Sequence, residues 1–162
     1  MVDMITNYRP GIVKYCYSLL LDYHEAQDAA QDVMLTAVRK AESLRDSDAI
    51  GTWLYRIAYS TCINIMRRKR LQRLFLQQEA SQLGAGTHQD SYNYGISPAL
   101  AAAINTLSPK DRALVYSRAV DEMEYHQLEA IYNTKAATLR KRYERARKKL
   151  LEQLTGKDEQ NG

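Results

Sequence analysis

The most informative chemistry in this 162-residue chain is a cluster of cations near its C-terminal end. Residues 133–150 contain eight lysines and arginines and one acidic residue, Glu144. Cations at this density neutralise phosphates and release the counterions that surround nucleic acid. A solvated basic helix without a ligand is the alternative, but with one acid it would gain little from ion pairs within the helix. The composition therefore favours a nucleic-acid ligand.

The sequence around these cations predicts a helix-turn-helix. Two stretches of helical periodicity, residues 124–132 and 135–153, are separated by a short turn. Asn133 in this turn adopts a left-handed backbone more cheaply than most residues, and Thr134 is the expected N-cap of the second helix. The start of such a helix presents side chains to base edges, and later cations reach the DNA backbone. The predicted duplex-binding residues are Lys135, Ala136, Ala137, Thr138, Arg140, Lys141, Arg142 and Arg145.

A second cationic cluster closes the third predicted helix. Residues 51–75 carry six cations and no acid, and residues 67–70 are all cations. Cations at a helix C-terminus complement the helix dipole, but their number exceeds what capping needs and favours contact with nucleic acid. Trp53 falls on the apolar stripe of this helix and is expected in the core. Tyr55 and Tyr59 are predicted to be exposed rings that stack on unpaired bases.

Helical periodicity extends along the chain, and no stretch shows the alternation of a strand. We expect a first helix capped by Asn7, with Pro10 in its first turn, and a second helix over residues 23–42. Ser-Pro pairs at residues 97–98 and 108–109 predict two more helix starts. The expected fold is all-α, with two small helical domains joined by a flexible linker and the helix-turn-helix in the C-terminal domain. The expected boundaries are 1–76 for the first domain, 77–96 for the polar linker, 97–155 for the second domain and 156–162 for a disordered tail.

Acidic and basic residues are concentrated in different segments of the chain, which suits a protein that binds both DNA and a basic protein. Residues 1–50 carry five cations and eight acids, in contrast to the two cationic clusters. Cys16 and Cys62 lie in apolar stretches without metal-ligand spacing and are expected to be buried thiols.

The sequence shows no catalytic constellation, so we expect a protein that is not an enzyme and has no cofactor or small-molecule substrate. Asp28 and Asp32 are four residues apart, but they lack the further ligands of a metal site, and we expect no metal. The N-terminus does not resemble a signal peptide, and no apolar run could span a membrane. We therefore expect a cytoplasmic protein.

Three segments, in this order, resemble an extracytoplasmic-function sigma factor of bacterial RNA polymerase. Residues 28–37 read Asp-Ala-Ala-Gln-Asp-Val-Met-Leu-Thr-Ala, similar to the family pattern Asp-Leu-Val-Gln-Glu-Val-Phe-Leu-Arg-Ala. Residues 53–58, Trp-Leu-Tyr-Arg-Ile-Ala, match the family outright and are followed by its basic run. Residues 107–112, Leu-Ser-Pro-Lys-Asp-Arg, resemble its Leu-Pro-x-x-x-Arg. The resemblance covers residues 8–154.

The resemblance implies a factor that binds core RNA polymerase, directs promoter-specific initiation and helps to melt promoter DNA. The residues implied to dock on the β′ clamp coiled coil are Asp28, Gln31, Asp32 and Leu35. The residues implied to hold the −10 element are Arg56, Tyr59, Ser60, Asn64, Arg67, Arg68, Lys69 and Arg70. The helix-turn-helix would read the −35 element beside the β flap. An anti-sigma factor, in some members anchored in the membrane, is the implied regulator.

Several residues depart from the family pattern. Ser60 and Asn64 stand where Asn and Asp are common, and Glu129 stands where a small residue is usual. Residues 133–135, Asn-Thr-Lys, replace the usual Gly-Ile-Ser, and residues 136–137, Ala-Ala, replace a more common Val-Gly. Two alternatives remain. A stand-alone helix-turn-helix regulator would need neither the acidic helix nor the second cationic cluster. A transcriptionally inactive sigma mimic would bind only an anti-sigma protein.

Overall fold

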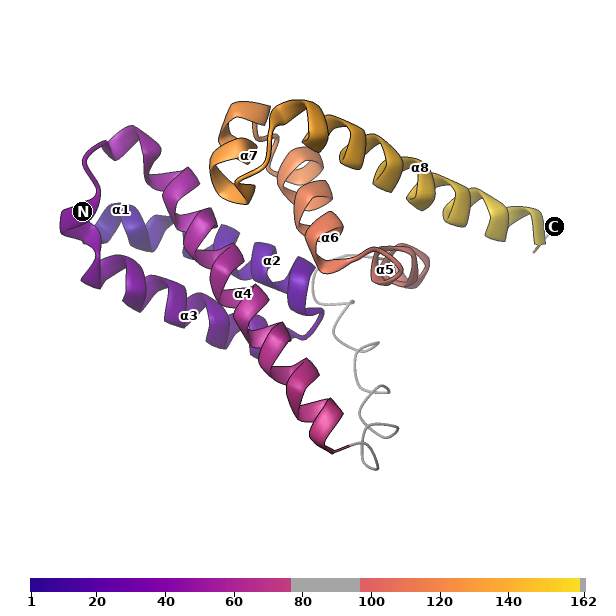
Figure 1. The fold of residues 1–162 in the computed structure, drawn as a ribbon, viewed down its shortest axis with the longest axis horizontal. Coiled ribbons are helices and arrows are strands. Elements are labelled where there is room, and N and C mark those ends of the chain that lie inside the picture. The colour runs from indigo at the N-terminus through magenta and orange to yellow at the C-terminus, as the bar shows by residue number, and fades with distance from the viewer. Residues whose placement is uncertain (77–96, 161–162) are drawn as a thin grey trace.

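The computed structural model describes residues 1–76 and 97–160, with side chains up to residue 156, and every regular element in them is helical (Figure 1). The N-terminal group comprises α1 (Val2–Asn7), α2 (Arg9–Leu20), α3 (Tyr23–Arg39), η1 (Ala41–Ser43), η2 (Ser47–Ala49) and α4 (Ile50–Phe75). The C-terminal group comprises α5 (Pro98–Asn105), α6 (Pro109–Val115), the π-helical turn η5 (Tyr116–Val120), α7 (Tyr125–Tyr132) and α8 (Ala136–Gln160). The predicted all-α fold with a C-terminal helix-turn-helix is confirmed. The predicted linker, 77–96, lies outside the described residues.

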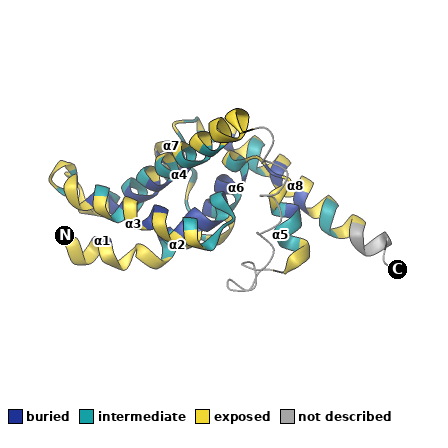
Figure 2. Cartoon of the chain, turned by 90° about the horizontal axis from the view of Figure 1, so that it is seen from below, coloured by how far each residue is buried: buried dark blue, intermediate teal, exposed yellow. Residues whose placement is uncertain are grey.

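Small side chains allow the N-terminal helices to approach closely. On α3, Ala26, Ala29, Ala30 and Ala37 are fully buried against α2 and α4. Figure 2 shows that the buried residues lie where α2, α3, α4 and α6 face one another. Because alanine loses no side-chain freedom on burial and adds little bulk, this face of α3 can hold two neighbouring helices at short range.

The N-terminal boundaries differ from the prediction in two respects. The helix predicted over residues 23–42 ends at Arg39 and is followed by the short turn η1. The prediction that Asn7 caps a helix is wrong, because Asn7 is the last residue of α1. Tyr8 joins α1 to α2 in a near-helical conformation. Pro10 lies in the first turn of α2, as predicted. Asp22 caps α3 by accepting a hydrogen bond from the Glu25 N–H at 3.0 Å.

The C-terminal group begins where its Ser-Pro pairs predict. The hydroxyls of Ser97 and Ser108 accept hydrogen bonds from the backbone N–H groups of Leu100 and Asp111, each at 3.2 Å. A small core between α5 and α8 contains Ala103, Leu107, Ala146 and Leu150. Helix α8 reaches Gln160, so residues 156–160, which the prediction places in a disordered tail, are helical.

The two groups contact each other directly: α7 packs on α4, and α6 packs on α2 (Figure 1). Residues of both groups belong to one buried apolar cluster, which includes Leu19 and Ala58 from the first and Leu114 and Leu128 from the second. In the described part of the chain, no helix combines the length and apolar character needed to cross a bilayer.

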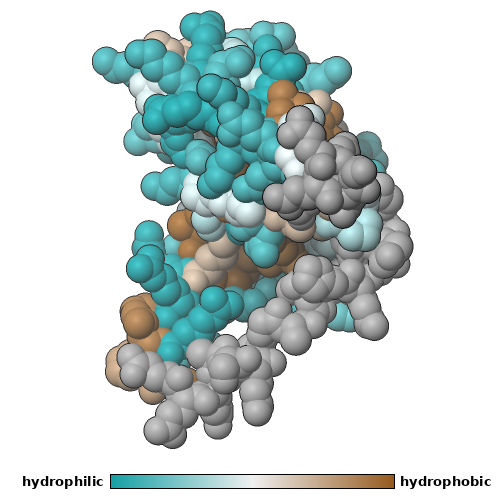
Figure 3. Space-filling model, turned by 90° about the vertical axis from the view of Figure 1, so that its right-hand side faces the viewer, coloured by the Kyte–Doolittle hydropathy of each residue, from teal (hydrophilic) through white to brown (hydrophobic). Residues whose placement is uncertain are grey.

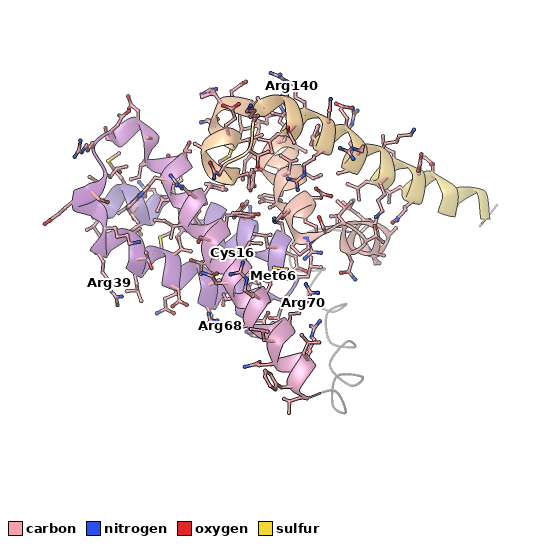
Figure 4. The ribbon with its side chains drawn as sticks, in the orientation of Figure 1. Cys16, Arg39, Met66, Arg68, Arg70 and Arg140 are labelled. Atoms are coloured by element: carbon pink, nitrogen blue, oxygen red, sulfur yellow. The ribbon has the colours of Figure 1, made fainter. Side chains whose placement is uncertain are left out.

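The two thiols are buried, as predicted. Cys16 on α2 lies beside α4 (Figure 4), and neither it nor Cys62 forms a disulfide. The pKa of the Cys62 thiol is raised, first by its hydrogen bond with Cys16 and then by burial. Both thiols therefore act as small apolar core groups.

Candidate nucleic-acid and protein interfaces

An exposed acidic face lies on α3, opposite its alanines. Asp28, Gln31, Asp32 and Leu35 follow one another at helical spacing, and all four are exposed. Half of the surface of Leu35 is open, at 49 %, and the neighbouring Val38 is similarly exposed, at 47 %. Two carboxylates followed by exposed apolar side chains are an arrangement that a basic protein surface with an apolar recess can bind.

The cationic face of α4 is exposed along most of its length. Arg56, Ser60, Asn64 and Arg67 recur at helical spacing, and all are exposed. Arg68 and Arg70 project from the C-terminal half of the helix, as Figure 4 shows. Guanidinium groups interleaved with short polar side chains can track a nucleic-acid backbone and still leave base edges accessible.

One cation of this cluster has a partner within the protein. Lys69 on α4 forms a salt bridge with Glu25 near the start of α3. The Lys69 side chain is 39 % exposed, so this pair contributes little to stability. Lys69 thus joins two helices and is less available for DNA than its neighbours.

The two tyrosines predicted to stack on bases have different environments. Tyr55 is 5 % exposed, so the prediction of an exposed ring is wrong for this residue. Its side chain points at the C-terminal group, where burial and the Asp121 carboxylate raise the pKa of its phenol. Tyr59 is half-buried, and its ring meets that of Tyr132 on α7 edge-on, with centroids 4.8 Å apart.

The turn of the helix-turn-helix is built by side chains close to it in sequence. Asn133 is left-handed, with φ 49° and ψ 46°, as predicted. The prediction that Thr134 caps α8 is wrong: its hydroxyl is turned toward the Tyr132 carbonyl, to which it donates at 2.9 Å. Glu129 takes that role: its carboxylate accepts the Ala136 N–H at 2.6 Å. The residue that departs from the family pattern therefore holds the start of α8.

The first turn of α8 is available to a ligand, since Lys135, Ala137 and Thr138 are exposed and Ala136 is half-buried. Leu139 anchors this turn in the core, at 1 % exposure. Small and polar side chains at the exposed start of a helix can approach base edges in a major groove.

The cations that follow differ in what they contact. The guanidinium of Arg140 lies over the ring of Tyr125, 4.8 Å from its centroid. Figure 4 shows Arg140 near the start of α8. Arg142 donates to the Asp111 carboxylate on α6 at 3.0 Å and is half-buried. Lys141 and Arg145 are exposed. Lys141 and Arg145 are therefore placed to reach phosphates, whereas Arg142 fastens α8 to α6.

Sequence reasoning missed Arg112 as a structural residue. Arg112 is 8 % exposed, and its guanidinium donates to backbone carbonyls, among them those of Ser18 and Leu19 on α2. The motif at residues 107–112 signals this arginine, but its partners lie more than 90 residues away in sequence. In the described residues, no group of three or more potential metal ligands is gathered.

Comparison with known families gives two matches that together cover most of the chain. The model described as Sigma-70 region 2 matches residues 4–72, which contain the faces on α3 and α4. The model described as Sigma-70, region 4 matches residues 97–150, which contain the helix-turn-helix.

Individual proteins are similar over nearly the whole length. The ECF RNA polymerase sigma factor SigW of Bacillus subtilis is 27 % identical, and the alignment covers 94 % of this chain and 87 % of SigW. RNA polymerase sigma factor SigV of the same organism is 23 % identical, over 98 % of this chain and 93 % of SigV. The sigma factor RpoE of Bartonella quintana, solved with the anti-sigma factor NepR, shares the fold with a TM-score of 0.71 at 22 % identity, over 93 % of this chain and 94 % of that one.

Proposed function

The chain belongs to the extracytoplasmic-function sigma factors of bacterial RNA polymerase, and we propose that it divides promoter recognition among three faces, on α3, α4 and α8. As a member of this family it binds core RNA polymerase and promoter DNA and directs promoter-specific transcription initiation. It acts as a DNA-binding initiation factor, while the polymerase carries out RNA synthesis. The observation that carries the proposal is the exposed acidic face of α3, which a stand-alone DNA-binding protein would not need.

In this proposal the acidic face of α3 docks on the β′ clamp coiled coil. Asp28 and Asp32 supply charge opposite to a basic partner, which raises the rate of encounter. Leu35 supplies an exposed apolar side chain, the kind of group that contributes binding energy when an interface buries it. The exposure of these side chains supports the assignment.

The face of α4 holds the −10 element as a single strand. Arg56, Arg67, Arg68 and Arg70 neutralise its phosphates, and Ser60 and Asn64 stand between these cations. Tyr59 offers the ring on which an unpaired base stacks, worth about 1–3 kcal/mol per base in such sites.

The start of α8 reads the −35 element as duplex. Thr138 and Ala137 approach base edges, and Lys135, Lys141 and Arg145 contact phosphates. Arg142, held by Asp111, sets the angle at which α8 leaves the rest of the C-terminal group.

The regulator follows by analogy with the RpoE of Bartonella quintana, which was solved with the anti-sigma factor NepR. We propose that an anti-sigma protein also binds this chain. The chain would act in the cytoplasm, where polymerase and chromosome meet, with an anti-sigma protein holding it at the membrane if that protein is anchored there.

The α3 assignment is tested by competition for core RNA polymerase against labelled wild-type chain. The variant Asp28→Lys with Asp32→Lys changes the charge by four units within the face, and Asp3→Lys with Glu42→Lys makes the same change at exposed sites outside it. Because like charges across an interface are costly, the first variant is expected to compete at least about tenfold less well than the control. Equal competition by the two variants would refute the docking face, and failure of the wild-type chain to bind would refute the function itself.

A further inference from the structure

An apolar groove lies where four helical segments meet. Its volume is about 340 Å³, and residues of α2, α5, α6 and η5 border it. The apolar part of its lining includes Leu21, Leu100, Ile104, Leu107 and Val115. Leu107 is buried and the other four are half-buried, so the groove is open to solvent. Protein interiors leave few voids larger than a water molecule, so a space of this size is a candidate ligand site.

The size and character of the groove limit what can occupy it. An apolar cavity of about 150 Å³ binds benzene, so about 340 Å³ accommodates roughly twice that bulk, or a chain of about ten carbons. Sites for small molecules begin at about 300 Å³ and are mostly apolar, with a few polar groups that fix orientation. Hydrophobic surface gathers near the middle of the molecule in Figure 3. The groove therefore suits a small molecule with an apolar body.

The charged side chains of the groove are both cationic. Arg112 and Lys14 belong to its lining, and no acidic residue in the described ranges does. Lys14 is exposed, and it interacts electrostatically with the Asp121 carboxylate, which lies outside the lining. Arg112 is buried. The groove thus has one positive charge at its solvent side and one that is shielded from solvent, and both favour an anionic group on the ligand.

Arg112 is a buried cation that no carboxylate of the described residues pairs. Its Nε, Nη1 and Nη2 donate to the carbonyls of Ser18, Leu107 and Leu19, at 3.1, 2.9 and 2.6 Å. A guanidinium has five N–H groups, so one on each terminal nitrogen has no acceptor in the described part of the chain. Burial also lowers the pKa of this group. Buried charges are normally paired, and a ligand carboxylate can accept two guanidinium N–H groups at once.

We propose that this groove binds a small amphipathic carboxylate. The carboxylate pairs with the guanidinium of Arg112, and an apolar body of about ten carbons lies against Leu21, Leu100 and Ile104. Burial of the apolar body supplies most of the affinity, and the pair with Arg112 fixes the orientation of the ligand and selects for an anion.

Other classes of small molecule match the groove less well. A neutral apolar molecule would leave the Arg112 cation unpaired, and a cationic one would be repelled by Arg112 and Lys14. A small inorganic anion would leave the apolar lining exposed to water. The lining contains no residue of the faces proposed on α3, α4 and α8, so the ligand site does not depend on those assignments.

The test compares two ligands on the full wild-type chain by proton–nitrogen correlation NMR. Decanoate is a linear carboxylate of the proposed length, and decanol has the same chain length without the charge. Decanoate is expected to bind saturably and to shift the backbone amides of Leu21, Leu100 and Ile104 and the Nε–H signal of Arg112. Decanol is expected to bind at least about tenfold more weakly, because it cannot form the charge-assisted pair.

Three variants locate the site, each checked for native circular dichroism. Ala101→Phe places a ring in the groove from α5, and Ala99→Phe places the same ring at an exposed position of that helix outside the lining. Ala101→Phe is expected to weaken decanoate binding at least about tenfold, and Ala99→Phe to leave it unchanged. Lys14→Gln is expected to weaken it no more than about threefold, because exposed ion pairs contribute little.

Each part of the proposal has a result that overturns it. Absence of saturable shifts up to about 1 mM decanoate would overturn the ligand site and leave the groove to an apolar side chain of a protein partner. Equal affinity for decanoate and decanol, or a tenfold loss in Lys14→Gln, would overturn the pairing with Arg112. Equal binding by Ala101→Phe and Ala99→Phe would place decanoate on the exposed cationic surfaces and overturn the groove as its site. The comparison of the two ligands needs no variant, so the proposal stays testable if Ala101→Phe does not fold.

Discussion

Glu129→Ala removes the carboxylate that accepts the Ala136 N–H at 2.6 Å at the start of α8. The first N–H groups of a helix have no intrahelical partners, and the positive end of the dipole favours an anion beside them. Loss of such a cap costs about 0.5–2 kcal/mol. Since the acceptor here is ionised, we expect the upper half of that range, about 1–2 kcal/mol. The Thr134 hydroxyl is directed at the Tyr132 carbonyl, to which it donates, and Glu129 is the acceptor that the structure places at the Ala136 N–H.

The loss is measured by urea unfolding followed by circular dichroism. Glu144→Ala is the matched control, because it removes the same charge from an exposed position within α8 itself. We expect Glu129→Ala to lower the free energy of unfolding by about 1–2 kcal/mol and the melting temperature by about 2–8 °C. The control should stay within about 0.5 kcal/mol of wild type.

The variants Glu129→Ala and Glu144→Ala also distinguish two effects on DNA affinity: fraying of the start of α8 and the loss of a negative charge. Both substitutions remove one negative charge near DNA, so both gain similarly in electrostatic attraction. Glu129→Ala alone also loosens the first turn of α8, so it should bind duplex DNA more weakly than Glu144→Ala does. Equal stability and equal duplex affinity of the two variants would show that Glu129 does not hold the start of α8.

Two further perturbations separate the roles of individual side chains. Lys141→Ala should reduce the slope of log affinity against log salt for duplex DNA by about 0.9, the value for one phosphate contact. Arg142→Ala should leave that slope unchanged while lowering the free energy of unfolding, because Asp111 loses its partner. A reduced slope for Arg142→Ala and an unchanged slope for Lys141→Ala would show that Arg142, and not Lys141, contacts a phosphate. Burial raises the pKa of both Tyr15 and Tyr132 above the ordinary value of about 10. These two phenols therefore lose their protons at lower pH in the unfolded chain than in the folded one, so the free energy of unfolding should fall as pH rises above about 10. In the folded protein, the absorbance of tyrosinate should show a fraction of tyrosines that titrates at higher pH than the others. A single transition of all tyrosines near pH 10 in the folded protein would contradict this.

Features set by neighbouring residues could be predicted from the sequence. Ser97 and Ser108 followed by proline begin helices because a capping hydroxyl and a fixed φ act within one turn. Asn133 is left-handed for an equally local reason. The residues of the acidic face on α3 were implied by the family resemblance, and they are exposed together. Their roles in binding polymerase and DNA remain proposals.

Features set by distant residues could not be predicted. Tyr55 was assigned to an exposed face from its position in one helix, but α4 is covered on two sides, by α2 and α3 and by α7. The buried guanidinium of Arg112 reaches carbonyls more than 90 residues away. The sequence marks Glu129 only as a residue that stands where a small one is usual, because its role as a cap depends on how the turn brings the Ala136 N–H, seven residues later, to its carboxylate.

The most direct test of the account is transcription by core RNA polymerase on fragmented genomic DNA of the organism that encodes the chain, with the 5′ ends of transcripts sequenced. The account predicts new start sites that appear only when the chain is added, each preceded by the same pair of elements at −10 and −35. Asp28→Lys with Asp32→Lys should abolish these starts, and Asp3→Lys with Glu42→Lys should preserve them. Polymerase that binds the chain but gains no chain-dependent start site would contradict the account and favour a transcriptionally inactive sigma mimic.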